Sequence, residues 1–381
     1  MTRAWLLVSG DFTPLGGMDC ANHALAKYLA VLAGARVHLV THRAWEDLAG
    51  LPAVTVHRVW RPWDRHLAGM PLLARSGRRW ARRLATEGAR TVVNGGNCRW
   101  ADVNWVHYVH AAYRPHAAGS ALYRLKTRAT HHYALAAERS ALAGARLVVC
   151  NSERTRRDVV ERLGVPEARA HVVYYGADAS RFAPVTAAER GAARRALGWD
   201  DERPLVVFVG ALGDRRKGFD TLFAAWEALC GERAWDGTLV VVGAGAELPT
   251  WEQRARALGL DERIRFLGFR RDVPAVLAAC DVLVHPARYE AYGLGVQEAL
   301  CRGLPALVSC SAGVAERYPS GLQGLLIPDP ENAADLADRL RGWRRHLEQF
   351  RAAVTPLADR LRAHSWDKMA AQIVRLVETA A

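Results

Sequence analysis

Glu290 and Glu298 stand eight positions apart in the second half of the chain, the first in a glycine-containing loop and the second on the helical segment that follows. The loop comes directly after a short apolar run, and open α/β sheets bind ligands at the carboxyl ends of their strands. A carboxylate there can accept paired hydrogen bonds from neighbouring hydroxyl groups. The backbone N–H groups of Gly293 and Leu294 can meet a phosphate at the helix N-terminus. The stretch therefore predicts a site for a ligand with hydroxyls and phosphates.

A cluster of cations lies upstream, in the stretch 207–219, whose residues have the order strand, glycine loop and helix start. It contains Arg215, Arg216 and Lys217. Cations are unfavourable at a helix N-terminus unless an anion joins them. Fixed cations would also offset the charge that develops on a departing diphosphate. We expect one or more of these cations to make this contact.

Both stretches resemble glycosyltransferase family 4, whose E-x7-E motif is matched by Glu290 and Glu298 with the following turn 303–305. The resemblance implies the GT-B fold, in which two Rossmann-like doubly wound domains face each other across a cleft. It also implies that the first glutamate contacts the sugar of a nucleotide-sugar donor and the second contacts the ribose hydroxyls. The family often has arginine after the glycine that ends the strand, where this chain has Ala211, so the choice between Arg215 and Arg216 stays open.

Three further segments resemble the family. Gly16 and Gly17 match its N-terminal glycine loop, whose backbone would approach the donor phosphates. No G-x-G-x-x-G follows the first strand, which argues against a hydride-transferring enzyme. His110 stands where the family has an active-site histidine beside the transferred sugar, and His107 is a secondary candidate. The loop that would meet the nucleobase, mostly through its backbone, is formed by Gly268, Phe269 and Arg270.

The resemblance implies a retaining hexosyltransferase that works by front-face attack, with His110, Glu290 and Lys217 as the catalytic residues. No Asp-x-Asp triplet occurs, so we expect no required metal and no cofactor besides the donor substrate, with a UDP-sugar favoured over a GDP-sugar. The expected acceptor is a glycan or glycolipid of cell-surface polysaccharide or lipopolysaccharide synthesis. Two alternatives are a nucleotide-sugar epimerase of GT-B fold and a catalytically idle nucleotide- or membrane-binding module.

Ten short apolar runs, separated by segments with helical spacing, predict buried parallel strands and hence an α/β fold. They are Ala4–Val8, Val37–Thr41, Thr91–Val93, Val103–Val109, Leu147–Cys150, Leu205–Val209, Leu239–Val242, Ile264–Leu267, Val282–Val284 and Ala306–Ser309. A chain of 381 residues exceeds the usual size of one hydrophobic core. We expect an acceptor-side domain at 1–183, a linker at 184–203, a donor-binding domain at 204–362, and a C-terminal helix at 363–381 packing back toward the first domain.

The formal net charge is +13, and it is unevenly distributed. Eight arginines lie in the region 61–90 against two acids, interleaved with Trp60, Trp63 and Trp80. Such a patch suits an anionic membrane or a phosphate-bearing acceptor, and a solvated helix face is the plainer interpretation. No nucleic-acid-binding motif is present, so we expect no nucleic-acid partner. The candidate patch residues are Arg78, Arg79, Arg82 and Arg83.

The seven cysteines are scattered without a Cys-x-x-Cys pair, which indicates a reducing compartment rather than a disulfide framework. The first apolar run is too short for a signal peptide, and no run reaches the length of a transmembrane helix. We therefore expect a cytoplasmic protein that associates with the inner face of the cytoplasmic membrane. The sequence does not indicate an oligomeric state.

Overall fold

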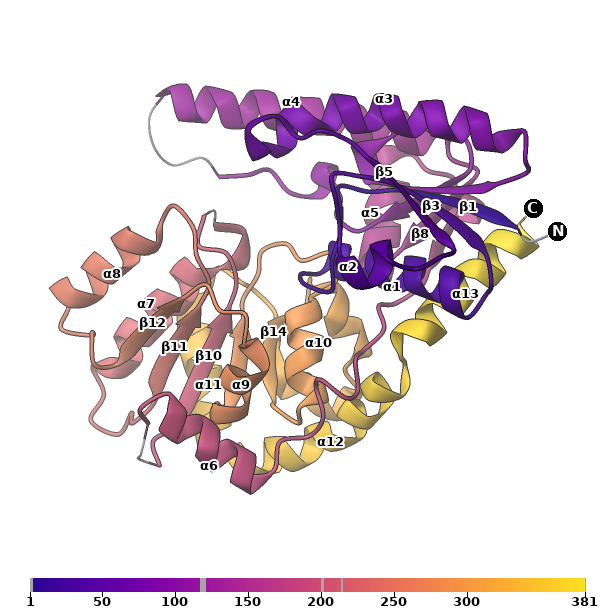
Figure 1. Ribbon diagram of the computed structural model, residues 1–381. Coiled ribbons are helices and arrows are strands. Elements are labelled where there is room, and N and C mark those ends of the chain that lie inside the picture. Colours follow the sequence, from indigo (N-terminus) through magenta and orange to yellow (C-terminus); the bar gives the residue numbers. More distant parts are fainter. Residues whose placement is uncertain (1–2, 117–120, 200–201, 214, 381) are drawn as a thin grey trace. The chain divides into compact units, whose positions relative to one another are not determined.

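The computed structural model describes residues 3–116, 121–199, 202–213 and 215–380. The chain forms two compact units, each built around its own parallel sheet with helices on both faces (Figure 1). The first unit contains most of the residues up to Gly176 together with His364–Ala381, and the second contains Ala177–Ala363.

The sheet of the first unit has seven parallel strands in the order β5-β3-β1-β6-β7-β8-β9. Chain order runs outward in both directions from β1, which makes the sheet doubly wound. A separate parallel pair joins β2 (Asp11–Phe12) to β4 (Arg43–Ala44). The seven strands are β1 (Ala4–Val8), β3 (Arg36–Thr41), β5 (Val54–Arg58), β6 (Arg90–Asn94), β7 (Val103–Val106), β8 (Leu147–Cys150) and β9 (Ala170–Val172).

The main helices of the first unit bury apolar faces on this sheet. They are α1 (Met18–Val31), α2 (Glu46–Ala49), α3 (His66–Ala85), α4 (Ala121–Gly144), α5 (Glu153–Leu163) and α13 (Trp366–Thr379). Helix α3 packs Leu73 and Leu84 against Leu6 and Val8 of β1. A side chain at Gly77 of α3 would place its Cβ 2.9 Å from Cγ1 of Val8, so this glycine permits the close approach.

The C-terminal helix α13 belongs to the first unit, where it lies beside α1 (Figure 1). The chain at Gly176 passes so close to the start of α13 that an added Cβ would lie 2.4 Å from backbone atoms of Trp366. His364 contacts the carbonyl oxygen of Tyr174 through Nε2 at 3.1 Å. These contacts anchor α13 on the last strand and loop of the first unit.

The sheet of the second unit has six parallel strands in the order β12-β11-β10-β13-β14-β15. The strands are β10 (Leu205–Val209), β11 (Thr238–Val242), β12 (Ile264–Gly268), β13 (Val282–His285), β14 (Ala306–Ser309) and β15 (Leu326–Ile327). The helices are α6 (Ala187–Ala196), α7 (Phe219–Cys230), α8 (Leu248–Ala257), α9 (Val273–Ala279), α10 (Leu294–Cys301), α11 (Ala333–Arg345) and α12 (Leu347–Ala363). Strand order reverses between β10 and β13, and ligands of such sheets bind at this switch point.

The segment 184–203, which we expected as a linker, is built into the second unit. It contains α6, whose Arg190 and Arg194 both bond to the carboxylate of the buried Asp281. The same carboxylate accepts a hydrogen bond from the backbone N–H of Leu205 at the start of β10. The segment is therefore anchored to the sheet.

Among the described helices, none is long and apolar enough to cross a bilayer.

Candidate functional site

The loops after β10 and β13 lie side by side because these two strands are hydrogen-bonded neighbours. The backbone N–H of Arg288 donates to the carbonyl of Arg216 at 2.8 Å, and the Arg216 guanidinium donates to the carbonyl of Tyr289 at 3.2 Å. Gly218 has φ +71°, and an added Cβ would lie 1.8 Å from the carbonyl oxygen of Pro286. Only glycine fits this contact, which brings the cations of one loop to the acid of the other.

Glu290 lies at the centre of this junction, with its side chain 14% exposed. Its Oε2 bonds to Nζ of Lys217 and lies 3.1 Å from Nε2 of His285 and 3.8 Å from Nη1 of Arg216. Burial alone would raise the pKa of Glu290, but Lys217, His285 and Arg216 outweigh it, and the net pKa shift is strongly downward. The carboxylate is therefore ionised and held by a set of cations and donors.

His285, the last residue of β13, is a site residue that the sequence analysis missed. It is 4% exposed. Burial, with Lys217 and Arg216 nearby, lowers its pKa despite the hydrogen bond to Glu290. A neutral imidazole can donate its Nε2–H to the carboxylate, so His285 orients Glu290 without competing for its charge. The signal was present in the sequence: a histidine ends an apolar run, in the same context that singled out His107 and His110.

The structure distinguishes the two arginines that the sequence left open. Arg215 has a half-exposed side chain that donates to Asp220 at 2.6 Å, in the first turn of α7. The Arg288 guanidinium also donates two hydrogen bonds to the Asp220 carboxylate, at 2.7 and 2.9 Å. Arg216 is therefore the arginine beside Glu290, whereas Arg215 belongs to a neighbouring structural ion pair.

Glu298, on α10, has a different environment from Glu290. In the part of the chain that the structure describes, no hydrogen bond joins its carboxyl group to another residue. Burial raises its pKa to about 7, a nearby Asp178 adds to the rise, and Arg181 opposes it. The acceptor oxygens of this carboxyl group are thus available to a ligand.

Gly293 begins α10 with φ +109°. An added Cβ would lie 2.9 Å from Cγ1 of Val314, so glycine is required for both conformation and space. Helix α10 then starts at Leu294, and the first amides of a helix have no intrahelical acceptor. The predicted phosphate contact at Gly293 and Leu294 therefore has a local structural basis.

The loop predicted to meet a nucleobase follows β12. Gly268 has φ +63°, and its carbonyl accepts a 2.8 Å hydrogen bond from the backbone N–H of Gly243. Phe269 is 72% exposed. The Arg270 guanidinium forms two bonds with Asp272, at 2.8 and 2.5 Å. This loop can therefore contact a ligand through the Phe269 ring and through its backbone, because the Arg270 side chain is bonded to Asp272.

The predicted residues of the first unit lie in the loops that follow β2 and β7. Gly16 has φ +82° and Gly17 precedes the first residue of α1. An added Cβ at either glycine would meet nothing within 4 Å, so the loop is open. Strand β7 ends at Val106, short of Val109 where we expected its end. His110 starts the short 3-10 helix η3 (His110–Ala112).

His107, the secondary candidate, is a structural residue. Its ring bonds to Asn94 at 2.8 Å and to the hydroxyl of Tyr175 at 2.5 Å. Burial lowers its pKa to about 3, which keeps the imidazole neutral. The Tyr175 hydroxyl also accepts from Asn151 at 3.1 Å. Tyr175 therefore completes a buried hydrogen-bond network with His107 and Asn151.

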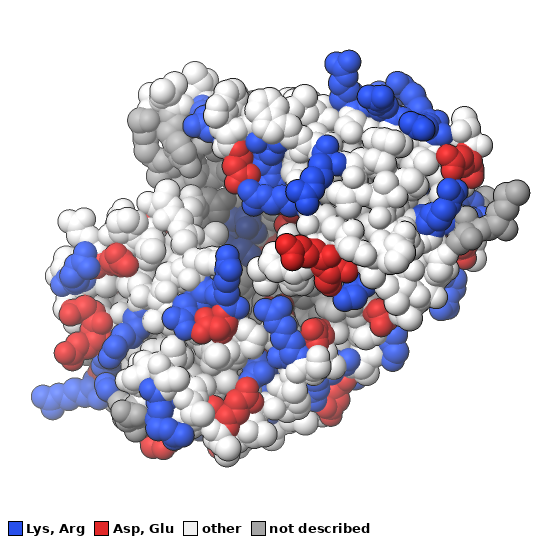
Figure 2. Space-filling view, in the orientation of Figure 1, with Lys and Arg blue, Asp and Glu red and all other residues white. Residues whose placement is uncertain are grey.

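Figure 2 shows lysine and arginine side chains gathered over α3. On this helix Arg79, Arg82 and Arg83 are exposed and Arg78 is partly so. The tryptophans divide: Trp60 and Trp63 are 72% and 81% exposed, whereas Trp80 packs on the core and stacks on His57 at 3.6 Å between ring centroids. Trp80 is therefore not part of the exposed face, because it completes the contact of α3 with the sheet.

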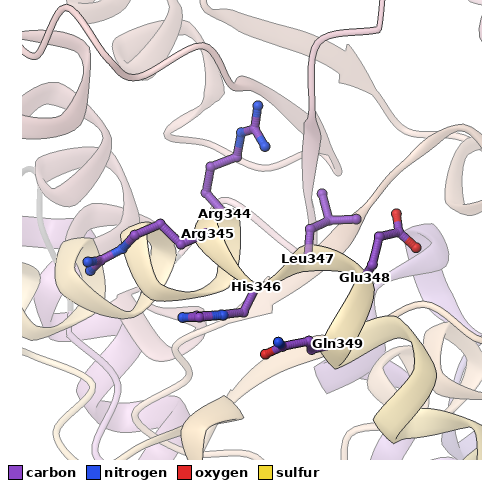
Figure 3. Close-up of a pocket in the computed structure, with 6 residues that line it drawn as sticks. All are labelled: Arg344, Arg345, His346, Leu347, Glu348 and Gln349. Atoms are coloured by element: carbon purple, nitrogen blue, oxygen red, sulfur yellow. The ribbon is translucent and has the colours of Figure 1, made fainter.

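A hollow of about 410 Å³ lies at the junction of α11 and α12 (Figure 3). Six consecutive residues, 344–349, line it, and their side chains point in different directions. None of the predicted site residues is among them. Within the described ranges, no group of three or more histidine, cysteine or acidic side chains could hold a metal ion.

The chain has two Rossmann-like units, with candidate ligand-binding loops at the carboxyl ends of their strands. This is the architecture of the GT-B glycosyltransferase fold. Residues 15–181 match the profile of Glycosyltransferase Family 4, and residues 189–349 match that of Glycosyl transferases group 1. Together the two matches cover most of the chain. The protein belongs to glycosyltransferase family 4.

Relatives and solved structures agree with this assignment. The D-inositol 3-phosphate glycosyltransferase of Corynebacterium aurimucosum is 31% identical over 248 residues, covering 62% of this chain and 57% of that protein. The chain thus matches less than three fifths of the length of the first curated relatives. The lipopolysaccharide glycosyltransferase WaaG has a TM-score of 0.75 at 21% identity, covering 98% of this chain and 99% of that chain. Anabaena HepE in complex with UDP and glucose has a TM-score of 0.71 at 19% identity, covering 99% and 100%.

Proposed function

We propose that this protein transfers a hexosyl group from a UDP-sugar to a glycan or glycolipid acceptor, with retention of configuration and without a metal ion. The observation that carries the proposal is the Glu290 carboxylate held by Lys217, Arg216 and His285 at the carboxyl end of β13. In this arrangement the single negative charge of Glu290 offsets part of the positive charge of Lys217 and Arg216. A diphosphate arriving at the cations would replace the acid as their counterion and free Glu290 for a sugar hydroxyl.

Glu298 supplies the second half of donor recognition in this proposal. Its partly buried carboxyl group accepts no hydrogen bond from the described residues, and vicinal ribose hydroxyls are donors of the type it lacks. The fold neighbour HepE holds UDP and glucose, which favours a UDP-sugar over a GDP-sugar as donor. Phe269 offers an exposed ring to the base.

The chemical step follows the role that each group can perform. Lys217 and Arg216 are fixed cations, so they stabilise the negative charge on the leaving nucleotide without reorganisation. His110 lies beside the transferred sugar, and the departing phosphate accepts the proton of the acceptor hydroxyl. The new glycosidic bond forms on the face from which the nucleotide leaves, and no covalent enzyme intermediate is formed.

The exposed arginines of α3 dock the protein on an anionic surface, either the inner face of the cytoplasmic membrane or a phosphate-bearing glycolipid. Trp60 and Trp63 are exposed near the start of that helix in sequence, and amphipathic rings suit a water-lipid boundary. We propose that the reaction belongs to cell-surface polysaccharide or lipopolysaccharide synthesis. The involvement of WaaG in lipopolysaccharide biosynthesis supports this assignment.

The test is a thermal-shift screen of UDP- and GDP-sugars, because a ligand that binds only the folded protein raises its apparent stability. Nucleotide release is then measured for each hit, with and without acceptors. A transferase releases UDP slowly even to water, an epimerase changes the sugar without this release, and an idle module does neither. Release should persist in excess EDTA. Loss of release that Mn²⁺ restores would contradict the metal-independent mechanism.

A further inference from the structure

Glu138 is an acid with 0% exposure, near the end of α4 in the first unit. Its Oε1 accepts the backbone N–H of His110 at 2.9 Å, and its Oε2 accepts the backbone N–H of Ala111 at 3.2 Å. Burial raises the pKa of Glu138 to about 7, against the opposing effect of these hydrogen bonds. A buried acid that only fills space is costly, so this one calls for a specific role.

The surroundings of Glu138 are shaped to bring it to this turn. Gly96 lies in the short helix η2 (Gly95–Asn97) after β6, and an added Cβ there would lie 3.0 Å from the backbone nitrogen of Glu138. Asn104 of β7 fixes the same short helix by donating to the carbonyl of Gly95 at 2.9 Å. The glycine therefore allows α4 to approach the ends of two central strands.

The loop from His107 to Ala111 is fixed at both ends. At the strand end, His107 bonds to Asn94 and Tyr175, and Asn151 donates to its carbonyl at 3.2 Å. At the other end, both oxygens of Glu138 hold consecutive amides. A carboxylate is suited to this task because it offers two acceptor atoms, whereas a glutamine would turn an N–H group toward one of the amides.

We propose that Glu138 is a positioning residue for His110: its carboxylate fixes the turn from which the His110 imidazole is presented. The inference rests on the proposed function, in which His110 lies beside the transferred sugar. Charged groups near Glu138 are Arg139 on the same helix, which favours its ionisation, and Asp158 on α5, which disfavours it. The ionised form is the one that accepts both amides.

The experiment compares Glu138→Gln with Glu161→Gln, an exposed acid on α5. Hydrogen exchange should show loss of protection at the amides of His110 and Ala111 in the first variant only. The Kd for free UDP, bound by the second unit, should stay unchanged. The kcat should fall by up to about a hundredfold, the scale of a catalytic group misplaced by about 1 Å. Gly96→Ala, which displaces α4 without touching the carboxylate, should reproduce these effects if Glu138→Gln folds poorly.

A double-mutant cycle with His110→Ala separates positioning from general stability. If Glu138 acts through His110, then the double variant is no slower than His110→Ala alone, because coupled residues are not additive. Additive losses would overturn the inference. Unchanged protection at both amides would overturn it as well, whatever the activity. The two proposals can fail separately. If the wild type turns over no donor, the proposed function is wrong. If Glu138→Gln still loses protection at both amides in that case, the role of Glu138 in fixing the turn stands.

Discussion

The protein has two basic regions that handle their charge in opposite ways. In the loops after β10 and β13, cations are paired with acids: Lys217 and Arg216 with Glu290, and Arg288 with Asp220. On α3, no ion pair joins Arg75, Arg79 or Arg82 to any described acid. The cations of the two loops are largely paired with acids, whereas several arginines of α3 present their charge to solvent.

The difference indicates two kinds of anion recognition. Paired cations around a partly buried acid are fixed in advance and poorly screened by salt, so they suit one anion in one orientation. Exposed arginines on a helix face have no fixed geometry, and salt screens them within about 10 Å at 0.1 M. They suit an extended anionic surface. Mutations should therefore act on turnover in the first region and on salt-sensitive association in the second.

The largest expected effect concerns the α3 face. Changing Arg78, Arg79, Arg82 and Arg83 to serine should weaken binding to anionic liposomes by up to about a thousandfold at low salt, since each basic residue contributes about 1 kcal/mol. Co-sedimentation with anionic and neutral liposomes, at low and high salt, measures it.

The control for this variant removes the same charge from scattered exposed positions. These are Arg157, Arg256, Arg345 and Arg360, again changed to serine. This control should lose much less affinity. If both variants lose the same affinity for anionic liposomes, the effect depends on net charge and not on the α3 face. If the wild type binds neither type of liposome, the patch is a solvated helix face.

The next effect concerns Lys217. Lys217→Ala should lower turnover on the order of a hundredfold, the scale of losing one preorganised charge-stabilising group. The matched control is Arg254→Ala, which removes an exposed cation paired with Glu227 at 3.2 Å, and it should retain wild-type turnover. Wild-type rates in Lys217→Ala would transfer the phosphate contact to Arg216. Full rates in the triple alanine variant that also changes Arg215 and Arg216 would contradict a diphosphate site in this loop.

A smaller effect should separate the two glutamates. Glu298→Ala should weaken free UDP and UDP-sugar alike by about tenfold, the scale of a hydrogen bond to a charged group. Glu290→Ala should spare free UDP, because its proposed partner is the sugar. Calorimetry with UDP and with the UDP-sugar measures both, and equal loss of UDP affinity in the two variants would contradict this division of roles.

The smallest effect is on stability. The pKa of Glu298 is raised to about 7 in the folded protein, above its unfolded value, so the folded state loses stability as pH rises from about 4.5 to 7. Glu298→Gln removes this loss. At pH 8 the free energy of unfolding of this variant should exceed that of the wild type by on the order of 2 kcal/mol, so it should unfold at a higher temperature. At pH 4 the two proteins should unfold at nearly the same temperature. Scanning calorimetry at both values tests the sign.

The fold was largely predictable because its central strands are buried on both faces and read as continuous apolar runs. All ten expected strands occur, four of them with identical bounds: β1, β8, β10 and β14. The edge strand β5 was missed because none of its residues is fully buried and its sequence is mixed, Val-Thr-Val-His-Arg. Helix α6 was taken for a linker because its surface is mostly polar, although its arginines reach the buried Asp281.

Residue types and spacing by themselves determined the two parallel sheets, the glycine-bounded loops at the strand ends and the residues in those loops. These features are local, because periodicity, glycine and buried runs act within a few positions. Glu290, Lys217 and Glu298 could be selected from these features together with the resemblance to glycosyltransferase family 4, before any contact was known.

Only the tertiary structure decided which of these residues meet. Arg215 and Arg216 are adjacent in sequence, yet one bonds to Asp220 and the other lies at Glu290. Burial and ion pairing likewise set the two glutamates apart, with a lowered pKa for Glu290 and a raised one for Glu298. Such differences depend on neighbours distant in the chain and on desolvation, which the order of residues does not contain.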